Sequence, residues 1–204
     1  MINRSLTAGC VLVTLGLLTA CANDNANDHG SNQSSTSPAS RTTSKSGEIP
    51  PAPKQPDGIN PVRFDPCFTI DDAMATSAGF DPKTRTRSDL VAGDTVVIGC
   101  SFERPKNADG EVTGDVIVRS KNTPIAGAAT SSHNTVISRD PIDGRPAVVF
   151  TDDAFPNFCN AAISSTDGVL EIVLSAIPGS TPASSSCDQV RGVAENFASA
   201  LGDK

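Results

Sequence analysis

The sequence predicts an α+β domain: an antiparallel sheet of five or six strands, with an N-terminal and a C-terminal helix packed on one face and two disulfides. Short segments of alternating apolar and polar residues, separated by turn residues, have the period of half-buried strands. Helix-capping patterns precede and follow this run of strands, and four cysteines fall in the same region. Helices at the two ends of such a run form no parallel crossovers, so we expect both to cover the same face.

Two capping boxes mark the predicted helices. Thr69 and Asp72 open a first helix that ends at Gly79. Ser185 and Asp188 open a last helix, whose apolar residues recur at helical spacing. These apolar residues are Val190, Val193, Ala194, Phe197, Ala198 and Leu201. They form one stripe, which predicts that the last helix lies on the sheet.

Six segments between the helices are predicted as strands. The clearest are 96–102, in which Cys100 points inward, and the hairpin of 159–164 and 169–177. The other predicted strands are 112–118, 135–138 and 146–150. The pattern of residues 123–134, rich in Gly, Ala, Thr and Ser, fits either a loop or a weak helix. A ligand is expected on the face of the sheet opposite the helices, or between helices and sheet.

The chain begins with the pattern of a bacterial lipoprotein signal peptide. Arg4 precedes an apolar run, Leu6 to Leu18, which is too short to span a bilayer. Leu18-Thr19-Ala20-Cys21 is a lipobox, with small residues before a cysteine whose thiol can carry a diacylglyceryl group. We expect cleavage before Cys21 and a lipid anchor on the outer face of the cytoplasmic membrane. The alternative is an ordinary signal peptidase site beside an ordinary cysteine.

A linker is predicted between the anchor and the domain. Its first part is rich in Asn, Asp, Ser and Thr, and its second part contains five prolines, which favour an extended spacer. About forty residues of flexible coil reach about 35 Å. The serines and threonines are either simply solvated or acceptors of O-linked sugars. The predicted organisation is a signal peptide at 1–20, a lipidated linker at 21–62 and a globular domain at 63–204.

Charge makes nucleic acid a poor partner. Cleavage before Cys21 removes Arg4 and no acid, so the 16 basic side chains become 15 against 23 acidic ones, a formal charge of −8. Binding to phosphates requires a basic surface that releases counterions. The basic residues are scattered except at Lys83–Arg87, which we expect to be a solvated strand or loop rather than a phosphate site.

The cysteines of the mature domain are expected to form disulfides. Cys10 is lost with the signal peptide and Cys21 takes the lipid, which leaves an even number in an oxidising compartment. The four that remain are Cys67, Cys100, Cys159 and Cys187. Three pairings are possible, and we favour the first with the second and the third with the fourth, since each pair would tie a helix to a strand. None lies in a C-x-x-C pair, so neither a metal site nor a redox pair is expected. No phosphate-binding glycine loop or haem motif is present, so no cofactor is expected.

Several motifs resemble a known family. Phe64-Asp65-Pro66-Cys67, Ala78-Gly79-Phe80-Asp81-Pro82, Gly99-Cys100-Ser101-Phe102 and a late Cys187 resemble actinobacterial lipoproteins that share the domain of unknown function 3558. That family is mainly mycobacterial and nocardial. The resemblance implies an envelope lipoprotein and supplies no established activity or catalytic residues.

Catalytic machinery is not expected. The two histidines are His29, in the linker, and His133, in a polar loop. A Ser-His-Asp system would need His133 with one of the acids Asp152–Asp153, and no nucleophile-elbow motif is present. Adjacent acids such as Asp71–Asp72 and Asp152–Asp153 normally point in different directions, which disfavours a glycosidase pair.

Binding is the favoured function, as a monomeric module without catalysis. The loop before Cys159 contains Phe155 and Phe158, and an exposed Phe155 could anchor a partner protein or an apolar ligand. The alternative places both rings in the core beside a disulfide. We therefore expect a membrane-tethered envelope protein that binds a protein partner or a small envelope component such as a lipid or glycan. The competing hypotheses are a structural surface domain without a ligand and an envelope hydrolase.

Overall fold

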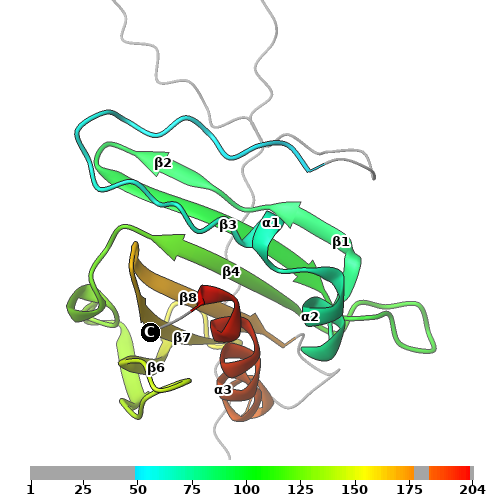
Figure 1. Ribbon diagram of the computed structural model, residues 1–204. Coiled ribbons are helices and arrows are strands. Elements are labelled where there is room, and N and C mark those ends of the chain that lie inside the picture. Colours follow the sequence, from blue (N-terminus) through cyan, green and yellow to red (C-terminus); the bar gives the residue numbers. More distant parts are fainter. Residues whose placement is uncertain (1–48, 177–183, 203–204) are drawn as a thin grey trace, which may run out of the picture. The chain divides into compact units, whose positions relative to one another are not determined.

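Figure 1 shows the computed structural model of the protein, which describes residues 49–176 and 184–202. In these residues, eight antiparallel strands form one sheet. The strands are β1 Asp81–Arg87, β2 Leu90–Ala92, β3 Thr95–Glu103, β4 Asp115–Lys121, β5 Asn134–Ser138, β6 Ala147–Asp152, β7 Phe158–Ser165 and β8 Gly168–Ser175. Their order is β1-β3-β4-β8-β7-β6-β5, and β2 pairs with β3.

The predicted number of five or six strands is too small. The two extra strands are β1 and β2, at one edge of the sheet. β1 includes the basic segment Lys83–Arg87 and contains no fully buried residue, and β2 is three residues long. An edge strand of this kind lacks the apolar alternation by which the six other strands are predicted.

Two short helices, α1 Pro66–Thr69 and α2 Asp72–Ser77, occupy the place of the predicted first helix. The prediction of Thr69 as an N-cap is wrong, because Thr69 is the last residue of α1. Ile70 then adopts an extended backbone, and the carboxylate of Asp71 accepts a hydrogen bond from the N–H three residues on, at 2.7 Å. Asp71 is therefore the N-cap of α2.

The C-terminal helix α3, Ser184–Ala198, packs its apolar stripe on β7 and β8, as predicted, and a 3-10 turn, η2 Ser199–Leu201, follows it. The ring of Phe197 packs against those of Phe80 and Phe102, at centroid distances of 6.3 and 6.4 Å. The chain contains no Trp or Tyr, and these phenylalanines are the largest fully buried side chains of the described residues. The predicted cap at Ser185 lies outside the side chains that the structure describes.

Both disulfides join the cysteines in the favoured pairing. Cys67 of α1 is bonded to Cys100 of β3, with 5.0 Å between the Cα atoms. Cys159 of β7 is bonded to Cys187 of α3, with 5.1 Å between the Cα atoms. Each bond ties a helix to a strand, and the two strands lie in different halves of the sheet.

Residues 49–62, the proline-rich end of the predicted linker, lie against the sheet. Val62 is buried and packs with Val96 and Ile98 of β3. The side-chain amide of Gln55 accepts a hydrogen bond from the N–H of Val62 at 2.8 Å and donates one to its carbonyl at 2.7 Å. This segment therefore contributes apolar contacts to the domain.

Alternation of side chains gives the sheet two different faces. We call the face that carries Cys100, Val118 and Ile172 the closed face, because the main core lies between it and the helices. The other face, which carries Ile117, Arg119 and Glu171, is the open face. A 3-10 turn, η1 Ile125–Gly127, and the residues after it cover one part of the open face over a smaller apolar cluster.

Candidate functional site

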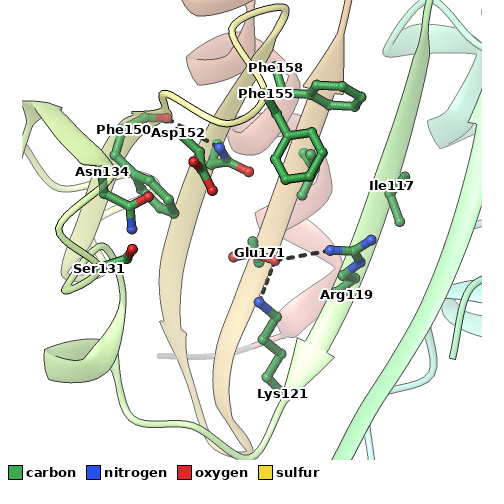
Figure 2. A pocket seen from close by; sticks show the side chains of 12 residues that line it. Ile117, Arg119, Lys121, Ser131, Asn134, Phe150, Asp152, Phe155, Phe158 and Glu171 are labelled. Atoms are coloured by element: carbon green, nitrogen blue, oxygen red, sulfur yellow. Dashed lines mark hydrogen bonds and ion pairs between the residues drawn. The ribbon is translucent and has the colours of Figure 1, made fainter. Parts of the chain in front are cut away.

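The open face carries a pocket of about 470 Å³ (Figure 2). Strands β4, β8, β7 and β6 form its floor with the side chains that alternate away from the core. Its lining residues are Ile117, Arg119, Lys121, Ser131, Asn134, Phe150, Asp152, Phe155, Phe158, Asn160, Glu171 and Val173. The predicted binding residues Phe155 and Phe158 both belong to this set.

The loop between β6 and β7 supplies the aromatic wall of the pocket. The Asp152 carboxylate accepts a hydrogen bond from the N–H of Ala154 at 2.9 Å, and the Asp152 carbonyl accepts one from the N–H of Phe155 at 2.9 Å. This turn brings Phe155 over Phe158, with the rings edge to face and 5.9 Å between centroids. Phe155 is 58% exposed and Phe158 is half-buried. The alternative, in which both rings lie in the core, is therefore wrong.

A group of charges occupies the other side of the pocket (Figure 2). Glu171 of β8 is only 11% exposed, and a buried carboxylate needs a partner. Lys121 supplies it, with 2.5 Å between its Nζ and Glu171 Oε2. Arg119 is paired in register with Glu171, but its Nη1 stays 3.8 Å from the same oxygen, beyond hydrogen-bond distance.

The remaining polar lining lies away from these charges. Figure 2 shows Asp152, Asn134 and Ser131 together on the side of the pocket nearest β6. Asn134 of β5 and Asp152 of β6 are paired in register, so their side chains share the open face. The pocket thus combines a basic end, a polar end and an aromatic wall.

Candidate catalytic groups are placed apart or used structurally. His133 is exposed, and within the described residues its imidazole has no hydrogen bond to an acid or a serine. Asp71 caps α2, while Asp72 pairs with Arg85 at 2.8 Å. In residues 49–176 and 184–202, no group of three or more His, Cys, Asp or Glu side chains could hold a metal ion.

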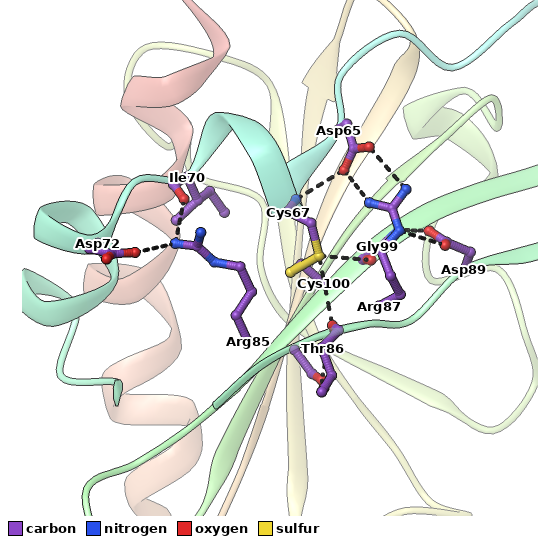
Figure 3. The surroundings of a disulfide bond; sticks show 11 residues. Asp65, Cys67, Ile70, Asp72, Arg85, Thr86, Arg87, Asp89, Gly99 and Cys100 are labelled. Atoms are coloured by element: carbon purple, nitrogen blue, oxygen red, sulfur yellow. Dashed lines mark hydrogen bonds and ion pairs between the residues drawn. A yellow bond between two sulfur atoms is a disulfide. The ribbon is translucent and has the colours of Figure 1, made fainter. Parts of the chain in front are cut away.

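The basic segment Lys83–Arg87 has a structural role in the closed face (Figure 3). Arg85 donates to the carbonyl of Ile70 at 2.9 Å and also binds Asp72. Arg87 donates to both carboxylate oxygens of Asp65, at 2.5 and 2.9 Å. The expectation of a solvated segment is therefore wrong for the two arginines, which hold α1 and α2 against β1 beside a disulfide.

Arg119, Lys121 and Glu171 were not predicted as site residues. They occupy alternate positions in two strands, and this pattern marks one face of each strand. However, β4 pairs with β8, about fifty residues later in the chain, and only that pairing brings the charges together. The local pattern of either strand alone gives no sign of the group.

The predicted lipid anchor lies outside the described residues. This applies to the signal peptide, to Cys21 and to His29. Among the described residues, no helix is long and apolar enough to cross a membrane.

The fold and the pocket define the class of protein. It is a disulfide-bonded domain in which an antiparallel sheet has helices on one face and an open pocket on the other. A family model described as "Protein of unknown function (DUF3558)" matches residues 16–199, so the chain belongs to this family. The chain matches no curated protein and no solved structure.

Proposed function

We propose that the protein is a lipid-anchored envelope module that binds a small envelope component, without catalysis, in the pocket of the open face. The observation that carries the proposal is the volume and lining of this pocket. About 470 Å³ exceeds the lower range of ligand sites, about 300 Å³. Apolar walls with a few convergent polar groups are typical of such sites.

The anchor is proposed from the sequence. The lipobox ending at Cys21 and the resemblance to actinobacterial lipoproteins support a diacylglyceryl anchor on the outer face of the cytoplasmic membrane. An anchored domain would meet membrane components and periplasmic or wall-derived molecules that diffuse along the membrane. This address suits a module that binds a component of the envelope.

A protein partner is a second candidate. Phe155 is 58% exposed beside the pocket, and an exposed aromatic side chain at the rim of a concave surface is a typical anchor for a partner. Both candidates are non-catalytic. The proposal that the protein is not a catalyst is supported by two observations: His133 is exposed, and Asp71 and Asp72 are used in a helix cap and an ion pair.

The binding function is tested on the anchored full-length protein, isolated from its native envelope and analysed by native mass spectrometry. We expect a co-purifying small molecule that the Phe155→Ala variant loses. Phe68→Ala is the matched control, because Phe68 is as exposed, at 61%, but lies on α1 and not in the pocket. Two results together would overturn the proposal: a mass equal to that of the lipidated chain alone, and a melting temperature that does not change when an extract of envelope small molecules is added.

The anchor has a separate test. Cys21→Ala removes the thiol that would carry the lipid, so the protein should move from the detergent phase to the aqueous phase or keep its signal peptide. Phase partitioning with an immunoblot measures this change. Partitioning identical to that of the wild type would contradict the anchor.

A further inference from the structure

Arg119 differs from the other buried or partly buried arginines of the described chain. Arg85, Arg87, Arg104, Arg145 and Arg191 each donate hydrogen bonds to a carbonyl, amide or carboxylate oxygen. Within the described residues the guanidinium of Arg119 donates none, and its nearest carboxylate oxygen is 3.8 Å away. Its side chain is 33% exposed and lines the pocket. A planar fork of unused donors suits a carboxylate or phosphate.

The charges around Arg119 leave a positive excess at this end of the pocket. Lys121 and Arg119 face the single carboxylate of Glu171, and Lys121 lies much closer to it. The three side chains together carry a net charge of +1, and the only ion pair of Arg119 among the described residues is a 3.8 Å contact with a carboxylate that Lys121 binds more closely. The three side chains are at most one-third exposed, so solvent screens this charge less than it would a surface charge.

The apolar part of the pocket begins at the residue pair next to Arg119 on the same face of the sheet. Ile117 and Val173 are paired directly opposite each other, next to the pair of Arg119 and Glu171 on the same face. Residues two positions apart in a strand are separated by about 7 Å. Phe155 and Phe158 extend the apolar surface beyond the pair of Ile117 and Val173 (Figure 2).

Asp152 limits how many acidic groups a ligand can carry. It lines the pocket on the side away from Arg119 (Figure 2). A second anionic group reaching that side would meet a like charge, which costs binding free energy. The arrangement suits one acidic group at one end of an apolar body.

Resting on the proposed function, we infer that the pocket selects a small amphipathic anion. Its carboxylate or phosphate is bound by the guanidinium of Arg119, and its chain or ring lies on Ile117, Val173 and the two phenylalanines of the wall. A free acid and the headgroup of a membrane lipid share this chemistry.

The test uses the anchored full-length protein in nanodiscs of zwitterionic lipid, with empty nanodiscs as the reference. Titration calorimetry compares octanoate and octyl phosphate with octanol, which has the same chain and no charge. We expect both anions to bind at least about tenfold more tightly than octanol, because a charge-assisted hydrogen bond replaces a neutral one. Repeating the titration in nanodiscs that contain phosphatidate distinguishes a free acid from a lipid headgroup as the ligand. If the site binds lipid headgroups, phosphatidate competes with octanoate, and octanoate binds more weakly there.

Variants assign the selectivity to Arg119. Arg119→Gln should bind octanol as the wild type does and lose the preference for the anions, while Arg119→Lys should keep part of it. Arg139→Gln is the matched control, because Arg139 is exposed and does not line the pocket. Equal affinity for octanoate and octanol in the wild type, or an unchanged preference for the anions in Arg119→Gln, would overturn the inference. The proposed binding function would still stand in either case. If neither octanol nor the anions bind, the inference fails; the proposed function fails as well if native mass spectrometry also finds no co-purifying small molecule.

Discussion

The two faces of the sheet use the same residue type in opposite ways. On the closed face, Arg87 is 10% exposed, donates two hydrogen bonds to Asp65 and a third to Asp89 (Figure 3). On the open face, Arg119 is 33% exposed and stays 3.8 Å from Glu171 (Figure 2). An arginine whose three guanidinium nitrogens all donate to carboxylates fixes the elements around it, whereas one with unused donors can bind a ligand. The closed face therefore uses its arginine to hold elements together, and the open face carries the arginine to which we assign ligand binding.

The largest effect is expected in the core under α3. Phe197 is fully buried against Phe80 and Phe102, so Phe197→Ala should lower the free energy of unfolding by about 3 to 5 kcal/mol through the cavity it leaves. Urea unfolding followed by circular dichroism measures this, because the chain has no Trp or Tyr for fluorescence. A loss below about 1 kcal/mol would show that the closed face is not the stabilising one.

The disulfide of the same face should rank next. Replacing both Cys67 and Cys100 by Ser opens a link across 33 residues, and the chain-entropy estimate for such a loop is about 3.5 kcal/mol. Changing both cysteines avoids a free buried thiol. We expect the urea concentration at half-unfolding to fall in the double variant by an amount that corresponds to this loss. An unchanged midpoint would contradict a stabilising role of the closed face.

A pair of arginine variants tests the comparison directly. Arg87→Gln leaves the carboxylates of Asp65 and Asp89 without their shared cation, so we expect a loss of about 2 kcal/mol. Arg119→Gln leaves Glu171 with Lys121, so we expect a loss within about 0.5 kcal/mol. The measurement is the difference between the two unfolding free energies. Equal losses would remove the distinction between the faces.

The smallest effect on stability is expected at the rim of the pocket. Phe155 is more than half exposed, so Phe155→Ala should change the free energy of unfolding by about 0.5 kcal/mol or less. Thermal unfolding of this variant beside wild type measures the change. A loss comparable to that of Phe197→Ala would mean that the loop belongs to the core.

Much of the closed face could be predicted because its signals are local. The stripe that includes Val190 and Phe197 shows the helical period. The pairs Cys67–Cys100 and Cys159–Cys187 are favoured among three pairings because each would join neighbours along the chain and tie a helix to a strand. One exception is the start of α2, where Asp71 is the N-cap because Thr69 is already the last residue of α1.

The open face was predicted less well because its signals are not local. Phe155 and Phe158 could be singled out, since two aromatic residues in a proline-containing loop are unusual. The pairing of β4 with β8, which places Arg119 opposite Glu171, depends on the topology of the whole sheet. A residue that looks like an ordinary solvated charge in the sequence therefore becomes part of a pocket only in the folded chain.

The bond between Cys159 and Cys187 has a consequence for the opposite side of the sheet. Phe158 and Cys159 are neighbours in β7, and neighbouring side chains in a strand point to opposite faces. The sulfur bridge to α3 thus lies directly behind an aromatic side chain that lines the pocket. The disulfide therefore fixes this part of β7 to α3 from the closed face, at a cysteine with 0% exposure, and the position of Phe158 at the pocket is held by a covalent link to the helix.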